Sequence, residues 1–443
     1  MRITIVGAGK VGYSVAQYLS QENHEVIVVE ADEAQRSAIQ EGLDVMTIGG
    51  NGGSPSVLSH PEIMTSDLFI ATTHNDEVNM IACAAAKKVG IPLTIASIRN
   101  DEYIETGETP FHKTMGIDLA INTSLVTAQK ISRILSIPSA IGAEDFAGGK
   151  IRLLEMRLRP ESSFIDVPLK GLALPPNVLA VGILRQGKVI IPHGEDRLLA
   201  YDNVFFIGPP DSLGALSERR PEEEARVENV MIIGAGRTGR YLAVILEKKG
   251  MMVKVIDRQE DRCRLLANQL KRGIVFCGEG TDVDLLAQEG VGEADAVICL
   301  TRDDELNLLL ALLAKDLGTQ RTFVRVNHPG YFSLMEKVGV DVVLSPNLTT
   351  AEAILGQVHR DKFTMLALLE GAKARALEIE VPEKSKVTGK KLKEIKFPAN
   401  CLVGAILRDD HVIVPNGNSV LEKDDRAVMF CLPDLVSKIE KYL

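Results

Sequence analysis

Two stretches of this chain carry residues whose types and spacing suit them to phosphate binding. Each is a G-x-G-x-x-G turn that follows a short apolar run and opens a helical pattern. In such a turn the first glycine permits a tight bend, the second lets the backbone approach a pyrophosphate, and the third lets the helix pack on its strand. The phosphates then lie at the helix N-terminus. The turns are Gly7-Ala8-Gly9-Lys10-Val11-Gly12 and Gly234-Ala235-Gly236-Arg237-Thr238-Gly239.

A carboxylate ends the next apolar run after each turn: Glu30 in the first half and Asp257 in the second. An acid about 20 residues after the turn hydrogen-bonds the ribose hydroxyls of NAD, and it would repel the additional phosphate of NADP. A glycine turn that binds nothing is the alternative, but motif, context and acid all occur twice. We therefore expect a dinucleotide or an adenine nucleotide to bind in at least one half.

Length and composition exclude several classes of protein. A chain of 443 residues is too long for one core. Its net charge of −10 argues against nucleic-acid binding, which needs a basic face. The absence of a long apolar run predicts no membrane insertion, and Met1 leads directly into a strand without a signal peptide. The cysteines form no C-x-x-C pair, which fits a reducing cytosol, and we interpret all of them as small core residues: Cys83, Cys263, Cys277, Cys299, Cys401 and Cys431.

The elements that must position these residues alternate between strand and helix. Apolar runs at 2–6, 25–30, 44–48, 67–71, 93–98 and 118–121 predict the strands of a doubly wound parallel sheet, and a helix is expected at 123–135. From residue 150 the pattern becomes a small β-rich module with strands at 153–158, 178–184, 189–192 and 202–207. The dense charges and proline of 216–228 predict a solvated linker.

The second half repeats this whole pattern, so the chain is an internal duplication. The segment 73–79 (THNDEVN) matches 301–307 (TRDDELN), and 189–192 (VIIP) matches 412–415 (VIVP). The predicted fold is α/β, with two Rossmann-like doubly wound parallel sheets, each followed by a small β-rich α+β module. The expected boundaries are 1–138 and 229–365 for the Rossmann domains, 150–215 and 372–443 for the modules, and 216–228 for the linker.

A Rossmann lobe with a D-[DE]-x-x-N element after its fourth strand, followed by a small β-rich module, resembles the RCK (KTN) unit that regulates potassium channels and transporters. Two such units in one chain resemble the peripheral subunits of bacterial Trk potassium uptake systems. The resemblance implies a regulatory protein and no enzyme, cytoplasmic and peripheral to the inner face of the cell membrane. It implies a homo-oligomer, ring-like, under a membrane-embedded Trk potassium transporter subunit, with NAD or NADH as ligand and ATP or ADP as alternatives in the same crevices.

The resemblance also assigns site residues. Gly7 to Val11 would hold the pyrophosphate, Glu30 the adenosine ribose, and Asn51 would face the adenine, while Thr73 and His74 would lie under the nicotinamide half or its phosphate. The second-half counterparts are Gly234 to Thr238, Asp257, Thr301 and Arg302. One departure concerns the end of the fifth strand, where the second half has Arg325 and the first has Ser97, with Arg99 two residues later. The relative affinity of the two sites stays open.

Two other functions are compatible with parts of this pattern. An NAD-dependent oxidoreductase needs a substrate pocket and an acid or base over the nicotinamide; only His74 is a candidate, and its counterpart is Arg302. An RCK sensor that acts on another cation channel or exporter stays possible, because contacts to a client protein form no motif. Three other features have structural interpretations that we favour over metal, membrane or effector binding: Asp303-Asp304-Glu305 as a helix start, 306–313 as a buried helix, and His193 and His411 as exposed loop residues.

Overall fold

The computed structural model describes residues 1–22, 24–104, 110–137, 140–216, 227–358, 365–369, 374–439 and 442. The chain forms two compact units. The first contains both Rossmann lobes and comprises Met1–Gln129, Met231–Lys248 and Val253–Val358. The second contains both β-rich modules and comprises Lys130–Val230, Lys249–Met252 and His359–Leu443. The predicted linker at 216–228 lies mostly outside the described residues.

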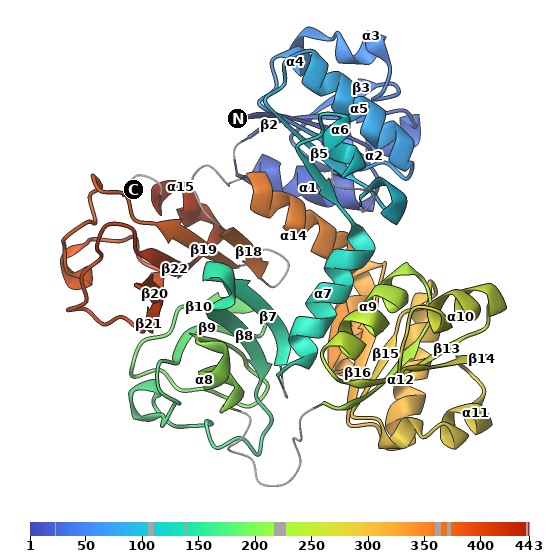
Figure 1. Ribbon diagram of the computed structural model, residues 1–443. Helices are drawn as coiled ribbons and strands as arrows, with labels where there is room; N and C mark the ends of the chain where they lie inside the picture. The colour runs from blue at the N-terminus through green and yellow to red at the C-terminus, as the bar shows by residue number, and fades with distance from the viewer. Residues whose placement is uncertain are drawn as a thin grey trace. The chain divides into compact units, whose positions relative to one another are not determined.

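Lobe 1 is drawn mostly in blue in Figure 1. Its six-stranded sheet has the strand order β3-β2-β1-β4-β5-β6. All five neighbouring strand pairs are parallel. The order reverses between β1 and β4, which places the crevice of a doubly wound fold at the carboxyl ends of these two strands. The strands are β1 (Arg2–Val6), β2 (Glu25–Glu30), β3 (Met46–Gly49), β4 (Leu68–Ala71), β5 (Leu93–Ser97) and β6 (Leu119–Ile121). The helices are α1 (Lys10–Gln21), α2 (Glu33–Gly42), α3 (Pro55–Leu58), α4 (Pro61–Met64), α5 (Asp76–Lys88), η1 (Asp101–Tyr103), α6 (Phe111–Thr114) and α7 (Thr123–Leu135).

Lobe 2 repeats this sheet with the order β14-β13-β12-β15-β16-β17. The predicted fold class is confirmed, and in lobe 1 the expected strand ends differ from the observed ones by no more than two residues. The strands are β12 (Asn229–Ile233), β13 (Met252–Asp257), β14 (Ile274–Cys277), β15 (Ala296–Cys299), β16 (Arg321–Arg325) and β17 (Val342–Leu344). The helices are α9 (Arg237–Lys248), α10 (Glu260–Ala267), α11 (Val283–Gln288), η4 (Val291–Glu293), α12 (Asp304–Asp316), η5 (Pro329–Tyr331), α13 (Phe332–Lys337) and α14 (Pro346–Val358).

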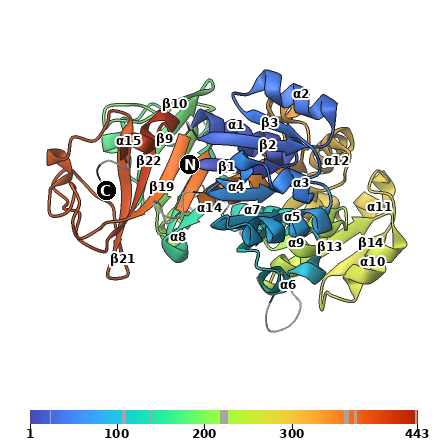
Figure 2. The same cartoon turned by 90° about the horizontal axis from the view of Figure 1, so that it is seen from above.

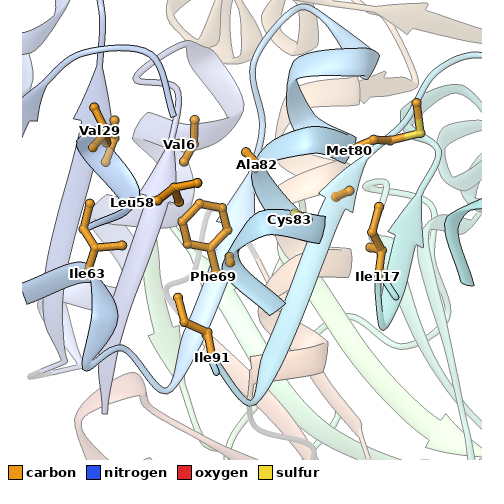
Figure 3. Packing of buried hydrophobic residues seen from close by; sticks show 14 of the residues in the cluster. Val6, Val29, Leu58, Ile63, Phe69, Met80, Ala82, Cys83, Ile91 and Ile117 are labelled. Carbon is orange, nitrogen blue, oxygen red and sulfur yellow. The ribbon is translucent and has the colours of Figure 1, made fainter. Parts of the chain in front are cut away.

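The strands are continuously apolar because helices cover both faces of a doubly wound sheet. In lobe 1 the ring of Phe69 is fully buried and lies among Leu58, Ile63 and Ile91 (Figure 3). Lobe 2 has the corresponding cluster around Met231, Val297 and Leu310. These cores hold the strand ends, and therefore the glycine turns, in fixed positions.

Helix α12 contains the apolar run 306–313, which we expected to be a buried helix. Leu310 and Ala311 are buried in the lobe 2 core, but Leu309 is 57% exposed and Leu312 is 36% exposed. The expectation was therefore only half correct. One face of the helix packs on the sheet and the other carries leucines at the surface. An unbroken apolar run in the sequence does not show which of its residues lie on which face. No helix in the described part of the chain is both long and apolar enough to cross a bilayer.

The two β-rich modules share one antiparallel topology, β10-β9-β11-β8-β7 in the first and β21-β20-β22-β19-β18 in the second. The outermost strands β7 and β18 escaped the sequence analysis, because β7 (Ala140–Phe146) is rich in small and acidic residues and β18 (Met365–Leu369) is short. The other strands are β8 (Ile151–Arg157), β9 (Leu179–Arg185), β10 (Lys188–Ile190), β11 (Asn203–Gly208), β19 (Ala374–Glu380), β20 (Cys401–Arg408), β21 (His411–Ile413) and β22 (Arg426–Cys431). The helices are η2 (Ala147–Gly149), η3 (Leu169–Gly171), α8 (Pro210–Gly214), η6 (Leu392–Glu394), η7 (Pro433–Leu435) and α15 (Val436–Ile439).

The modules bury one common core between their sheets. Phe205 of β11 and Phe430 of β22 pack against each other with ring centroids 5.5 Å apart and ring planes tilted by 42°. A Cβ atom on Gly182 would lie 2.5 Å from the Phe430 ring, so glycine at this position lets the sheets approach closely. Figure 2 shows β19 and β22 side by side in the second module, as their antiparallel pairing requires. His193 and His411 are both exposed, as expected, but only His193 lies in a loop, because His411 begins strand β21.

Candidate functional site

A cavity of about 1570 Å³ lies within the first unit at the glycine turns of both lobes. Its walls come from the ends of the inner strands and the loops that follow them, which is where doubly wound folds bind ligands. All but three of the predicted site residues line it: Gly7, Gly9, Lys10, Val11, Glu30, Asn51, Thr73, His74, Gly234, Ala235, Gly236, Arg237, Thr238, Asp257, Thr301, Arg302 and Arg325. Ala8, Gly12 and Gly239 are not among the lining residues.

The three glycines of each turn serve different purposes. Gly7 has a φ of +97° and Gly234 a φ of +114°, a conformation that favours glycine. A Cβ on Gly12 would lie 1.9 Å from the Gly7 carbonyl oxygen, so the third glycine is needed for packing. The middle glycine, Gly9, is different, because a Cβ there would meet no atom within 4 Å. The same is true of Gly236. The middle glycines thus keep an open surface clear at the helix N-terminus.

The acids that end β2 and β13 bind the glycine turns directly. Glu30 accepts hydrogen bonds from the Ala8 amide (2.6 Å) and from the Asp32 amide (2.9 Å). Asp257 accepts from the Ala235 amide (2.7 Å) and from the Gln259 amide (2.8 Å). An ionised carboxylate has about four lone-pair positions, so each acid retains capacity for ribose hydroxyls. The acid therefore orders the turn and faces the crevice as well.

Buried side chains of residues 75–79 (NDEVN), after β4, support the crevice wall; this segment has Asn75 where lobe 2 (303–307, DDELN) has the first acid of the D-[DE]-x-x-N pattern. The Asn79 side chain accepts from the Thr73 amide (2.9 Å) and donates to the Ser97 carbonyl (2.8 Å), which ties the loop after β4 to the end of β5. Asp76 accepts from the amides of Arg99 (2.9 Å) and Asn100 (2.8 Å). Buried polar groups at these positions thus satisfy backbone amides that would otherwise lie unpaired at the sheet edge.

Lobe 2 repeats this arrangement, and its hydrogen bonds show the role of the acidic cluster at 303–305. Asp303 is the N-cap of α12 and accepts from the Leu306 amide (2.8 Å). Asp304 is buried and accepts from the amides of Asn327 and His328, both at 2.9 Å. The helix-start interpretation is confirmed. Among the described residues, no group of three or more His, Cys, Asp or Glu side chains is arranged to hold a metal ion.

Arg325, at the end of β16, is the most distinctive charged group of the cavity wall. Its Nη2 donates to the Asn327 side-chain oxygen (3.0 Å), while its buried Nε has no hydrogen-bond partner among the described residues. Burial lowers the pKa of Arg325, and the neighbouring Arg302 acts in the same direction against Asp304. The side chain is half-buried, and a guanidinium with an unpaired N–H group at a cavity wall is suited to bind an anion.

Lobe 1 has Ser97 at this position, and Arg99 lines the same cavity from two residues further on. The Arg99 Nε lies 3.3 Å from Asp76, so its charge is already paired. The two crevices therefore differ in charge. Lobe 1 lines the cavity with two cations, Lys10 and Arg99, against Glu30 and Asp32. Lobe 2 contributes six arginines against three carboxylates: Arg237, Arg240, Arg258, Arg262, Arg302 and Arg325 against Asp257, Glu279 and Asp303.

The two lobes contact each other through residues that lie next to the glycine turns. The Lys10 ammonium donates to the Asn327 carbonyl oxygen (3.2 Å). On the other side, Asp101 of lobe 1 accepts from Arg240 of α9 (2.7 Å) and from the Tyr241 hydroxyl. Helix α14 of lobe 2 packs on α1 of lobe 1. Each glycine-turn helix is thus in contact with the opposite lobe.

Sequence reasoning missed several residues of the cavity. Arg240, Arg258 and Arg262 line it, but they follow no phosphate-binding motif. Arg258 directly follows the predicted ribose-binding acid Asp257, which is the one positional signal that could have indicated it; Arg240 and Arg262 lie within α9 and α10. The expectation that every cysteine is a core residue was wrong for Cys277, which is exposed, and only partly right for Cys401, which is half-buried; Cys83, Cys263, Cys299 and Cys431 are buried.

Fold and cavity together define a duplicated Rossmann protein with paired nucleotide-type crevices. The family model described as "TrkA-N domain" matches residues 3–123 and 230–346, and the model described as "TrkA-C domain" matches 153–219 and 376–443. The chain therefore belongs to the TrkA family, with an N and a C domain in each half.

Relatives match over the whole chain. A Trk system potassium uptake protein TrkA homolog from Archaeoglobus fulgidus is 36% identical, with 100% of this chain and 99% of that protein covered. The Trk system potassium uptake protein TrkA of Azorhizobium caulinodans is 31% identical, with 100% of this chain and 98% of that protein covered. Among solved structures, the GsuK channel bound to NAD matches with a TM-score of 0.63 at 21% identity over 100% of this chain and 78% of that one. That likeness concerns the fold.

Proposed function

We propose that this chain is the nucleotide-binding regulatory subunit of a Trk-type potassium uptake system. The observation that carries the proposal is the open surface at the middle glycine of each turn. In both lobes this surface lies at a helix N-terminus, next to an acid suited to ribose. The names of its relatives, Trk system potassium uptake proteins, supply the transport context.

NAD or NADH is the proposed ligand of both crevices, with ATP or ADP as competitors for them. The predicted site residues fit this chemistry: Gly7 to Val11 and Gly234 to Thr238 for the phosphates, and Glu30 and Asp257 for the ribose. When bound, the dinucleotide would supply charge and shape. The described cavity wall offers one histidine, His74, and Arg302 takes its place in lobe 2, so we propose no catalysis.

Regulation would use the contacts between the lobes. A protein responds to a ligand only through the ligand's different affinity for two conformations. Phosphates bound at the N-terminus of α9 would act on Arg240 and Tyr241, which already contact Asp101 of lobe 1. A phosphate at α1 would act on Lys10, which contacts Asn327 of lobe 2. A ligand bound in either crevice would therefore act on residues that contact the opposite lobe.

The partner would be a membrane-embedded Trk potassium transporter subunit, supplied by a separate polypeptide, at the inner face of the cell membrane. Several copies of this chain would assemble beneath it as a ring. We propose Rossmann domains at 1–138 and 229–365 and modules at 150–215 and 372–443, although β7 and β18 extend the two module sheets towards the N-terminus.

Calorimetry tests the ligand assignment. NAD, NADH, ATP and ADP would be titrated into the purified chain and into Glu30→Ala and Asp257→Ala variants. Micromolar binding without turnover, weakened at one site by each variant, supports the proposal. Binding of none of the four nucleotides would refute it. Consumption of NADH with a reducible substrate would instead favour an oxidoreductase.

A further inference from the structure

Two cysteines of lobe 2 lie next to the backbone of Asp257, the acid predicted to bind ribose. Cys263 lies on α10, and its Sγ donates to the carbonyl oxygen of Asp257 (3.2 Å). Cys277 ends β14 and is the register partner of Asp257 across the β13–β14 pair. The Cys277 Sγ lies 4.0 Å from the carbonyl oxygen of Arg258, the residue after Asp257, and the Cys263 Sγ lies 3.6 Å from the carbonyl oxygen of Phe276, the residue before Cys277. Both sulfurs therefore lie at the residue that holds the second glycine turn.

The same two positions are adjacent in lobe 1, which lacks the thiols. Arg36 of α2 corresponds to Cys263, and Gly49 at the end of β3 corresponds to Cys277. A Cβ atom on Gly49 would lie 2.4 Å from the Arg36 guanidinium. The contact between these positions is thus a property of the fold, while the thiol pair belongs to lobe 2 alone. Lobe 1 is a matched control within the same molecule.

The two thiols differ in access. Cys277 is exposed, whereas Cys263 is 7% exposed. Burial, followed by the neighbouring Cys277, raises the pKa of Cys263 to about 11. An oxidant in solution therefore reaches Cys277 first, and Cys263 is placed to react second.

We propose that Cys263 and Cys277 form a reversible oxidation site that weakens nucleotide binding in the lobe 2 crevice. The oxidant class is a low-molecular-weight disulfide. The Cys277 thiolate attacks one of its sulfurs, forms a mixed disulfide and releases one small thiol. Cys263 then loses its proton and attacks the Cys277 sulfur, which releases the second small thiol. Two protein thiols are oxidised to one disulfide, and the reagent disulfide is reduced to two thiols.

The bond would change the crevice through Asp257. A disulfide needs sulfurs about 2.05 Å apart and Cβ atoms near 3.8 Å, so α10 and the end of β14 must move together. The next residues along the chain, Gly278 and Glu279, respond directly. The Gly278 amide donates to the Asp257 carbonyl oxygen (3.1 Å), and Glu279 lines the cavity. Oxidation also removes the Cys263 donor from that carbonyl. The carboxylate of Asp257, which orders the glycine turn, shifts with its backbone.

The test uses the full chain in buffers of hydroxyethyl disulfide and mercaptoethanol. Free thiols are alkylated and the disulfides are located by peptide mass spectrometry, while calorimetry with NADH gives the affinity of each site. Cys277→Ser and Cys263→Ser remove the pair without adding bulk. Cys401→Ser is the control, since Cys401 and Cys431 are register partners across β20 and β22 and form a second candidate pair.

We expect a Cys263–Cys277 bond and at least fivefold weaker NADH binding at the lobe 2 site, with lobe 1 unchanged and full recovery on reduction. The Cys277→Ser variant should be insensitive to the oxidant, and Cys401→Ser should behave as wild type. Coupling is reciprocal, so saturating NADH should oppose disulfide formation by the same factor. A different disulfide, no disulfide, or a Cys263–Cys277 bond with unchanged affinity would overturn the proposal.

The effect on affinity rests on the proposed function, and the two can fail separately. If the reduced chain binds no nucleotide, the proposed function is refuted and the regulatory part of this inference falls with it. The peptide map decides independently whether the two thiols form a bond.

Discussion

Replacing the glycines of the first turn one at a time separates ligand binding from folding. Gly9 has a φ of −64° and a ψ of −178°, which alanine adopts without strain, and its Cβ would meet no atom within 4 Å. Gly12 is the contrasting position, because its Cβ would lie 1.9 Å from the Gly7 carbonyl oxygen and 2.9 Å from Thr72 Oγ1. The two substitutions add the same methyl group to one turn.

The expected magnitudes follow from these contacts. A glycine replaced by alanine in a compatible conformation stabilises a protein by about 0.4–1 kcal/mol, chiefly by restricting the unfolded chain. Gly9→Ala should therefore leave the free energy of unfolding unchanged or slightly raised. The same methyl group occupies the surface that a pyrophosphate would approach. Loss of one hydrogen bond to a charged group costs about 1.5–3 kcal/mol, which corresponds to roughly 10- to 150-fold in affinity.

Gly12→Ala, in contrast to Gly9→Ala, should lower the free energy of unfolding. A backbone oxygen cannot move aside as a flexible side chain can, so α1 must shift away from β1, at a cost of about 1–3 kcal/mol or more. Urea unfolding measures the stability of both variants, and calorimetry with NADH measures the affinity of the lobe 1 site. The lobe 2 site is the internal control. Wild-type affinity at both sites in folded Gly9→Ala protein would refute the placement of the phosphates at this turn.

Three further predictions concern the differences and the contacts between the lobes. Arg325→Met should weaken nucleotide binding at the lobe 2 site about tenfold or more without lowering stability in urea, because the guanidinium has a buried Nε without a hydrogen-bond partner among the described residues and makes only one neutral hydrogen bond, to Asn327. A large loss of stability would show a structural role. Raising the salt concentration from 50 to 500 mM should weaken the lobe 2 site more steeply than the lobe 1 site, since six arginines line it; equal slopes by calorimetry would contradict this. Asp101→Asn removes the ion pair with Arg240. The affinity of each site should then no longer depend on whether the other site is occupied, while the affinity of each site alone is kept. Unchanged coupling between the sites would exclude the Asp101–Arg240 contact as its carrier.

The features that the sequence predicted best depend on local rules. Glycine turns, buried strands and the helix at 123–135 follow from residue type and spacing, and α7 was predicted with its observed bounds. The helix-start role of Asp303 was also predictable, because an acid before an apolar helix complements its dipole. These features need only neighbours along the chain.

The features that the sequence analysis missed depend on contacts between residues far apart in the chain. Strand β7 has a weak pattern of its own and is held by its pairing with β8. Asn79 marks the family in sequence, but only the structure shows that it links Thr73 to Ser97. The proximity of Cys263 and Cys277 arises where α10 packs on β14, and a spacing of 14 residues follows no cysteine motif.

Potassium uptake measured with this chain and its transporter tests the central claim most directly. The chain carrying both Gly9→Ala and Gly236→Ala would be compared with wild type in cells or vesicles that contain a Trk membrane subunit, with and without NADH or ATP. We expect the double variant to remain folded and to assemble with the transporter, while the nucleotide no longer changes the potassium flux. A flux that still responds to nucleotide, in a variant shown by calorimetry to bind none, would contradict the account.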